Sequence, residues 1–196
     1  RAFLSELDQD GILDWEESFV DATFIPAKKG AGVGKTKRGK GTKYLVVVDG
    51  QGIPLGSHTA SASPAEITLL EAVIEDIKVP KKGPGRPRTR PKRVIGDKGY
   101  DSDWFREALE SLRIQPCIPG RSGRKEPVEY DQQAYKQRNR IERMFGRLKD
   151  WRRIATRYDR CAHTFMGAIT VAAIVRALAA VLLAILTGQI GERRVG

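Results

Sequence analysis

The pattern of apolar and polar positions predicts an α/β domain. Residues 18–25 combine aromatic and β-branched side chains, and residues 44–48 form an unbroken apolar run. Both segments are typical of strands, and the second is typical of a strand buried on both faces. A turn at 49–52 leads into a third strand at 53–60, which completes an antiparallel meander. Two further short strands are predicted at 94–97 and 114–118.

Helical spacing of apolar residues appears between and after these strands. It predicts helices that begin at Ser63-Pro64 and end before Pro80, then over 103–113, 131–151 and 163–187. The residues of the long third helix that are predicted to face the core are Ala134, Ile141, Phe145 and Leu148. This order predicts a mixed five-stranded sheet flanked by helices, as in ribonuclease H-like (integrase-like) folds, with an extra apolar C-terminal helix. We divide the chain into a polar entry loop (1–17), the α/β domain (18–160) and a C-terminal helix and tail (161–196).

One stripe of polar residues runs along the predicted 131–151 helix. Tyr135, Arg138, Glu142 and Lys149 are spaced by 3, 4 and 7 residues. At ~100° per residue they fall within an arc of ~60°, about a quarter turn from the core-facing residues. The stripe therefore lies at the edge of the buried face, where it can border a cleft.

Glu142 belongs with two acids that lie in strand-like segments, Asp21 and Asp97. Hard cations such as Mg²⁺ take carboxylate oxygens, and phosphodiester chemistry uses two such ions roughly 3.5–4 Å apart. We therefore predict that Asp21, Asp97 and Glu142 form a two-metal catalytic site. The alternative is that each acid is a surface charge or a turn residue.

Positive charge favours a polyanionic partner, and the chain carries a net charge of +11. Two acid-free basic segments, 28–43 and 81–93, are rich in Gly or Pro and are predicted to be loops that contact DNA phosphates. The predicted DNA-binding residues on these loops are Lys35, Lys37, Arg38, Arg86 and Arg88. An anionic membrane and a generally basic soluble protein are the weaker alternatives.

The motifs that carry these residues resemble those of a known family. They are Asp21-Ala-Thr23, Gly96-Asp97-Lys98-Gly-Tyr100-Asp101 and Tyr135-x2-Arg138-x3-Glu142-x6-Lys149. Together they resemble the catalytic domain of bacterial insertion-sequence transposases of the DDE class, in the insertion-sequence-four superfamily and its insertion-sequence-five branch. The resemblance covers roughly Trp15 to Val175.

This resemblance implies cleavage at terminal inverted repeats and transfer of the 3′-hydroxyl into target DNA. It implies two Mg²⁺ ions, with Mn²⁺ as a substitute, and Asp21 bridging both. Tyr135, Arg138 and Lys149 would hold the double-stranded DNA end, with Lys98 and Arg140 as further contacts. A homodimer on DNA and a cytoplasmic, nucleoid-associated location in a bacterium are also implied.

The chain departs from this family in lacking an N-terminal helix-turn-helix segment. We expect such a segment to be supplied separately, for example by another reading frame, because the chain begins without Met. The alternative function is a truncated or domesticated remnant that only binds DNA.

Three weaker patterns are set aside. The Gly-rich stretch 30–36 resembles a phosphate-binding loop, but its first glycine is replaced by Lys29 and no helix is predicted to follow, so no nucleotide is expected. Acids in 6–17 approximate a calcium loop without the flanking helices. Residues 165–186 could span a bilayer by length, but the central Arg176 and several alanines favour a packed helix or a dimer surface.

Overall fold

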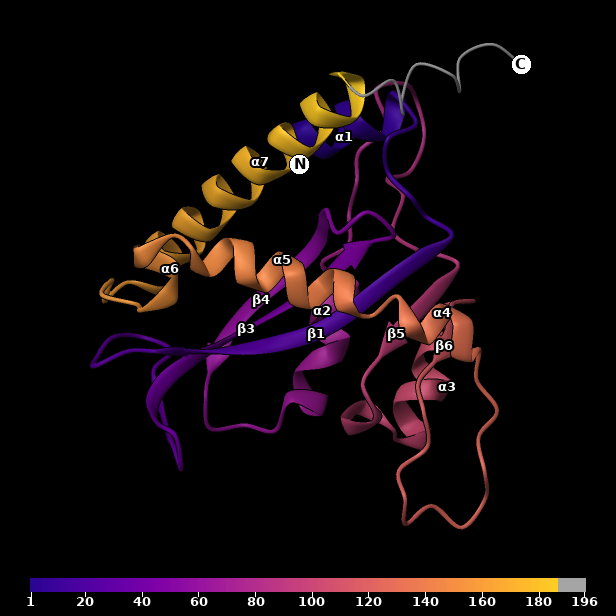
Figure 1. Ribbon diagram of the computed structural model, residues 1–196, viewed down its shortest axis with the longest axis horizontal. Helices are drawn as coiled ribbons and strands as arrows, with labels where there is room; N and C mark the ends of the chain where they lie inside the picture. Colours follow the sequence, from indigo (N-terminus) through magenta and orange to yellow (C-terminus); the bar gives the residue numbers. More distant parts are fainter. Residues whose placement is uncertain (187–196) are drawn as a thin grey trace.

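The structure, a computed structural model, describes residues 1–186 and contains a mixed sheet between two layers of helices (Figure 1). The strands are β1 (Glu17–Pro26), β2 (Gly34–Thr36), β3 (Gly39–Asp49), β4 (Pro54–Ser61), β5 (Arg93–Gly96) and β6 (Gln115–Cys117). The sheet order is β2-β3-β1-β5-β6, with β4 also pairing with β3. All five predicted strands are present, and β2 is a sixth, short strand that the sequence did not reveal.

The sheet is antiparallel on one side of β1 and parallel on the other. β1 pairs with β3 and β3 with β4 in antiparallel register, whereas β1, β5 and β6 run parallel. Hairpin turns suffice for the first group, but the parallel strands need crossovers. These crossovers are the helical segments after β4 and after β5.

The first helical layer covers one face of the sheet. It holds α1 (Ala2–Gln9), the 3₁₀ helix η1 (Glu66–Leu69), α2 (Leu70–Glu75) and α3 (Asp103–Ser111). The 3₁₀ helix η2 (Lys98–Tyr100) follows β5 directly. Val20 and Leu45 face this layer, together with Leu70 and Phe105 from its helices.

The second layer covers the opposite face with α4 (Gln132–Lys136), α5 (Asn139–Lys149), α6 (Arg152–Ala155) and α7 (Ala162–Leu186). Because successive strand residues point to opposite faces, Phe19 and Tyr44 face this layer while their neighbours Val20 and Leu45 do not. The four core residues predicted on the long helix, with Met144, are buried here. Figure 1 shows α5 crossing the sheet with α7 above it.

The predicted 131–151 helix was wrong in one respect, because it is broken between α4 and α5. The amides of Gln137, Arg138 and Arg140 each bond to the carbonyl three residues earlier, at 3.0 Å. This 3₁₀-like turn tightens the chain locally, a choice that the spacing of apolar residues does not specify.

Three other local predictions were also wrong. Residues 1–17 are not a loop, because α1 forms and buries Leu7. Residues 28–43 are not a loop either, since β2 pairs with Gly39–Gly41 in a hairpin. The helix predicted from Ser63 starts only at Glu66, because the Ser63 hydroxyl instead contacts the Lys35 carbonyl of that hairpin at 3.5 Å.

The C-terminal helix was predicted from 163 to 187, and α7 runs from Ala162 to Leu186; Thr187 lies outside the described residues. A segment of α7, Ala162–Leu182, is long and apolar enough to cross a membrane. The same helix buries Phe165, Ile169 and Ala172 in the core beneath α5 and α6. These contacts make α7 part of the second helical layer in this structure.

Candidate active site

Strand register sets Asp21 and Asp97 side by side. β1 and β5 are parallel and aligned so that Val20 pairs with Gly96, and each acid is the next residue along its strand direction. Neighbouring strands are ~4.8 Å apart, so the two acids begin from adjacent backbone positions. Asp21 shares its face with Phe19, and Asp97 shares its face with Ile95, so the strand alternation turns both acids toward the α4–α5 layer.

Arg138 connects Asp21 to Glu142. Its Nη1 donates to Asp21 Oδ2 at 3.1 Å, and its Nη2 donates to Glu142 Oε1 across one helical turn. The Asp21 side chain is 19% exposed, whereas that of Glu142 is 54% exposed. The break between α4 and α5 places Arg138 at the N-cap of α5, where its guanidinium reaches over β1.

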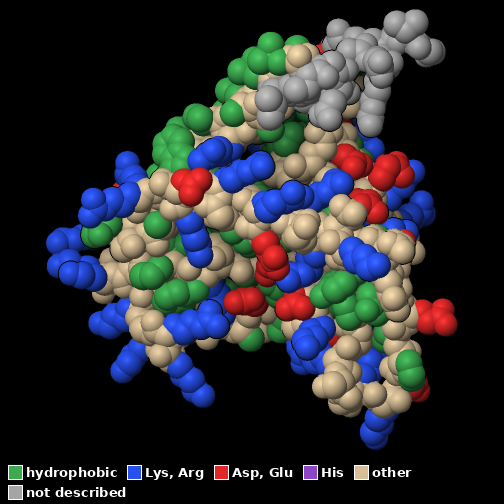
Figure 2. All heavy atoms as spheres, viewed as in Figure 1, with side chains coloured by type: hydrophobic (Ala, Val, Ile, Leu, Met, Phe, Trp, Pro, Cys, Tyr) green, Lys and Arg blue, Asp and Glu red, His purple; other side chains and the backbone are tan. Residues whose placement is uncertain are grey.

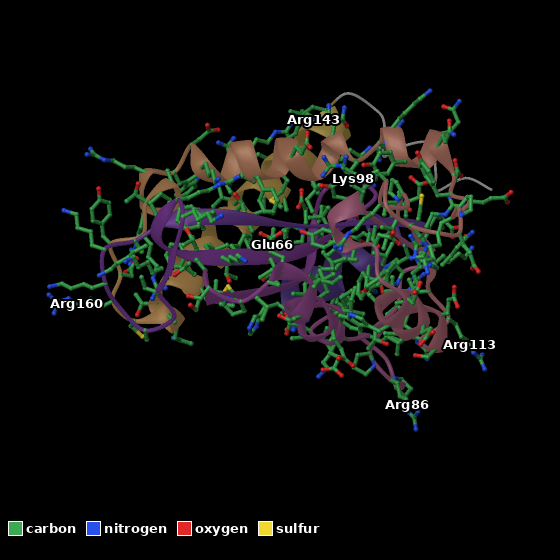
Figure 3. All side chains as sticks on the ribbon, turned by 90° about the horizontal axis from the view of Figure 1, so that it is seen from below. Glu66, Arg86, Lys98, Arg113, Arg143 and Arg160 are labelled. Atoms are coloured by element: carbon green, nitrogen blue, oxygen red, sulfur yellow. The ribbon has the colours of Figure 1, made fainter. Side chains whose placement is uncertain are left out.

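Two tyrosines complete the contacts of the acids. The Tyr100 hydroxyl lies 3.0 Å from Asp21 Oδ1 and 3.1 Å from Glu66 Oε2, and the Tyr135 hydroxyl donates to Asp97 Oδ1 at 3.5 Å. Glu66 is a fourth acid at the site that sequence reasoning missed. No motif surrounds it, and its only sequence signal was an acid near the start of a predicted helix. Figure 3 shows it near the middle of the molecule, beside the sheet.

Burial controls the electrostatics of these side chains. It raises the pKa of Asp21, against the opposing effects of the Ala22 amide, Tyr100 and Arg138. Burial by itself would lower the pKa of Arg138, but the carboxylates of Asp21 and Glu142 outweigh it and the pKa rises. Arg138 therefore stays charged between two acids. Burial also lowers the pKa of Lys149, whose Nζ lies 3.5 Å from the Phe24 carbonyl.

The donor chemistry of the three acids fits a hard divalent cation, because all are carboxylates. Their present arrangement differs from a closed metal site. Within residues 1–186, no three His, Cys, Asp or Glu side chains are grouped so that they could hold one ion. Arg138 instead provides the positive charge between Asp21 and Glu142. A cation can join these acids only if the Arg138 guanidinium moves aside.

The basic residues predicted to bind DNA lie in several places. Figure 2 shows acidic side chains in the middle of the face that α5 crosses, with Lys and Arg side chains around them. Exposed Lys35, Lys37 and Arg38 lie on the β2–β3 hairpin. Lys98, also exposed, directly follows Asp97.

The second basic segment, 81–93, lies away from the candidate catalytic acids. Figure 3 places Arg86 on the side of the molecule away from α5. Arg88 is occupied within the fold, because its guanidinium lies 4.5 Å from the Trp15 ring centroid and 3.6 Å from Asp8 Oδ1. Lys35 and Thr36 of the Gly-rich stretch lie in β2, so the stretch leads into a strand and not into the helix that a phosphate-binding loop requires.

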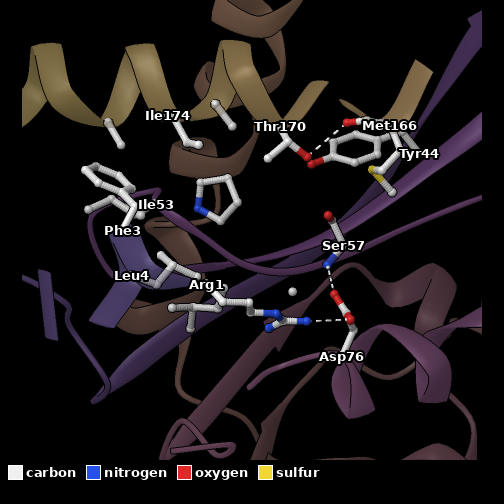
Figure 4. A pocket seen from close by; sticks show the side chains of 15 residues that line it. Arg1, Phe3, Leu4, Tyr44, Ile53, Ser57, Asp76, Met166, Thr170 and Ile174 are labelled. Carbon is white, nitrogen blue, oxygen red and sulfur yellow. Dashed lines mark hydrogen bonds and ion pairs between the residues drawn. The ribbon is translucent and has the colours of Figure 1, made fainter. Parts of the chain in front are cut away.

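A cavity of about 380 Å³ lies elsewhere, between α1, β4 and α7 (Figure 4). Arg1 Nη2 bonds to Asp76 Oδ1 at 2.7 Å at its rim, and the Ser57 amide donates to Asp76 Oδ2 at 3.0 Å. Burial raises the pKa of Tyr44, which also lines the cavity, to about 12. None of the predicted catalytic acids lines it.

Comparison with known proteins gives a consistent result. Residues 16–177 match the family model described as "Transposase DDE domain". The chain is 33% identical over 122 residues to the putative transposase of insertion sequence element IS402 from Burkholderia cepacia, covering 62% of this chain and 56% of that protein. It is 30% identical over 132 residues to the putative transposase of IS6501 from Brucella ovis, covering 67% of this chain and 93% of that protein.

Among solved structures, the fold is similar to a cryo-EM structure of the piggyBac transposase synaptic complex with hairpin DNA. The TM-score is 0.51 at 10% identity, covering 81% of this chain and 45% of that chain. At this identity the similarity concerns the fold, which is the mixed sheet flanked by helices described above.

Proposed function

The chain belongs to the transposase DDE domain family, and from that premise we propose that it cuts and joins DNA at the ends of an insertion sequence. The observation that carries this proposal is that Asp21 and Asp97 occupy adjacent positions on two central strands, β1 and β5, while the Arg138 guanidinium joins Asp21 to Glu142. The matched region spans 56% of the first relative, so the activity of the whole protein is part of the proposal. Membership in the insertion-sequence-five branch stays a prediction.

Asp21, Asp97 and Glu142 would hold two Mg²⁺ ions, or Mn²⁺ in their place, which activate water and stabilise the leaving oxygen. The chain's own cations bind the DNA. The Arg138 guanidinium already holds two carboxylates in a fork, and the same geometry suits the oxygens of a phosphate. Arg138 can therefore exchange its carboxylate partners for the scissile phosphate.

Lys149 and Tyr135 would position the same DNA end. The partly buried Lys149 ammonium acts as a point charge beside β1, and the Tyr135 hydroxyl lies at Asp97. The nucleophiles are water and then the 3′-hydroxyl of the cut strand. No protein side chain attacks the DNA, so Tyr135 is not expected to form a covalent adduct.

The test is Mg²⁺-dependent nicking of a labelled duplex that carries the terminal repeat. We expect Glu142→Gln to reduce nicking by about 10²–10³-fold, the loss expected for a ligand worth several kcal/mol in the transition state. Glu110→Gln, an exposed acid on α3, is the matched control and should nick like the wild type. Equal nicking by Glu142→Gln and wild type would refute the role of Glu142.

A second candidate function is a remnant that binds DNA without cutting it. The observation that favours it is the ion pairing of Arg138 with two of the three acids, which leaves these carboxylates without the grouping of a metal site. The same assay separates the two functions. A remnant would bind the duplex but leave it intact at every Mg²⁺ and Mn²⁺ concentration.

The proposal also covers partners and location. Double-stranded DNA is the substrate, both as element end and as target. A homodimer, a separate helix-turn-helix segment for end recognition, and a cytoplasmic, nucleoid-associated location follow from the family alone. Size-exclusion chromatography with and without the terminal-repeat duplex tests the dimer.

A further inference from the structure

A groove of about 580 Å³ lies between α5, α7 and the turn before β4. Four arginines line it: Arg140, Arg143, Arg147 and Arg176. No Asp or Glu is among the described residues that line this arginine groove. Figure 2 shows Lys and Arg side chains along the front of the molecule between α5 and α7.

The arginine groove lies on a different side of α5 from the candidate active site. Counting from Glu142 at ~100° per residue, Arg143 and Arg147 lie at ~100° and ~140° around α5, while Arg138 and Lys149 lie within ~40° of Glu142. Figure 3 shows Arg143 at the outer surface of α5. One helix thus carries the acid Glu142 and the DNA-holding residues on one side and a row of arginines on another.

The charges of the groove are poorly neutralised by the protein itself. Within residues 1–186, no acid forms an ion pair with Arg140, Arg143 or Arg147. Arg140 donates to the Gly50 carbonyl and Arg143 to Asn139 Oδ1 at 3.4 Å, which are neutral acceptors. Only Arg176 has an acid partner, as its Nη2 lies 2.9 Å from Asp150 Oδ2.

The base of the groove strengthens this positive field. Met144 and Leu148 are buried and line the groove beside the arginines of α5, and Ile53 and Ala177 line the opposite wall. Apolar walls exclude water and so reduce the screening of the guanidinium charges. Three uncompensated arginines beside an apolar base form a site for an anion with several charges.

We propose that the arginine groove binds the phosphate backbone of a second stretch of duplex DNA, beyond the end that occupies the active site. Arg140 to Arg147 span about 10 Å of helix axis, close to the length of about three phosphates on one strand. Contacts of this kind position DNA without reading its sequence. The inference rests on the proposed function for the existence of a first duplex in the active site.

The test removes two charges from the groove with Arg143→Gln and Arg147→Gln together. The matched control is Arg113→Gln with Lys125→Gln, which removes two exposed charges elsewhere. Fluorescence anisotropy measures the binding of a random-sequence duplex and of a terminal-repeat duplex over a range of KCl concentrations. Losing two phosphate contacts should reduce the magnitude of the negative slope of log K against log salt by about 1.8, and the control should reduce it by much less.

The two duplexes distinguish the two sources of this DNA. If the arginine groove holds target DNA, the groove variant loses affinity for the random duplex and loses strand transfer from precut ends, while nicking is kept. If it holds DNA flanking the element end, binding and nicking of the terminal-repeat duplex fall together. An unchanged slope on both duplexes, with the variant folded by circular dichroism, overturns the inference. If the groove variant has a shallower slope of log K against log salt but the wild type does not nick DNA, the groove is supported and the proposed activity is refuted.

Discussion

Two acids in one short segment, Asp97 and Asp101, belong to clusters that the fold treats in opposite ways. The Asp101 side chain is 2% exposed and both its oxygens accept bonds: Oδ1 accepts from Arg106 at 2.8 Å and Arg124 at 3.2 Å, and Oδ2 from the Arg121 amide at 2.8 Å. Asp97 belongs to the candidate active site, where Asp21 and Glu142 share the single guanidinium of Arg138.

The difference shows what each cluster can do. The cations around Asp101 come from α3 and from the loop after β6, so they tie the segment after β5 to two other parts of the fold. Arg138 lies at the end of a helix and pairs with an acid that is more than half exposed. Its contacts can therefore be exchanged for a ligand. An acid that is buried and paired with several fixed partners is structural, whereas an acid with few or exposed partners is available to bind a ligand.

The largest effect is expected for Asp101→Asn. Burial alone would raise the pKa of Asp101, but the Arg121 amide and the Arg106 and Arg124 guanidinium groups hold it below its usual value. Removing the charge leaves Arg106 buried without its partner, which should lower the free energy of unfolding by about 3–5 kcal/mol in urea melts. Because the folded pKa is depressed, this stabilisation is present at neutral pH and is lost as the pH falls through the folded value. If Asp101→Asn were as stable as wild type, Asp101 would not be structural and the contrast between the two clusters would be refuted.

The next effect sharpens the contrast, because Asp21→Asn should act on activity and not on stability. Burial raises the pKa of Asp21, so its charge is less favourable in the fold than in the unfolded chain. Neutralising it should leave the free energy of unfolding unchanged or raise it by up to about 1 kcal/mol. Nicking should nevertheless fall by about 10²–10³-fold. A large loss of stability would show that Asp21 is structural like Asp101.

A second buried acid, Asp49, tests the rule for a carboxylate that has no ion-pair partner within residues 1–186. Its carboxylate is fully buried and accepts bonds from the amides of Asp14, Gln51 and Ile53. Burial raises its pKa to about 6, opposed by these amides and assisted by the nearby Asp14 charge. A raised folded pKa means that its contribution to stability is present below the unfolded pKa and is lost as the pH rises toward about 6.

Comparison of wild type with Asp49→Asn isolates this effect. Urea melts from pH 3.5 to 7 should show the wild type losing about 2–3 kcal/mol relative to the variant as the pH rises. Parallel pH profiles for the two proteins would mean that folding does not shift the pKa of Asp49.

These acids also show how far the sequence could reach. Period-two alternation in the strands was enough to bring Asp21 and Asp97 to one face, and helical spacing put Glu142 beside Arg138, because both patterns follow backbone geometry. The residues that contact these acids could not be predicted from the sequence. Glu66 meets Tyr100 only through the packing of η1 against η2, and the turn that frees Arg138 from a continuous helix is set by local hydrogen bonds. Likewise, Asp101 was visible within a motif but its three basic partners were not.

The smallest effect is expected for Asp150, whose one ion-pair partner within residues 1–186 is Arg176 at the arginine groove. Both side chains are exposed, at 65% and 40%, so the pair is screened by water and Asp150→Asn should change the free energy of unfolding by less than about 0.5 kcal/mol. A double-mutant cycle with Arg176→Gln in urea would measure the coupling directly.

The Asp150→Asn variant should still affect DNA binding, because it leaves Arg176 uncompensated beside three other arginines. The slope of log K against log salt should steepen by up to about 0.9, the value for one additional phosphate contact. If Asp150 contributes little to stability but weakens DNA binding, the rule extends to the groove. A phosphate can then replace the weakly paired Asp150 as the partner of Arg176.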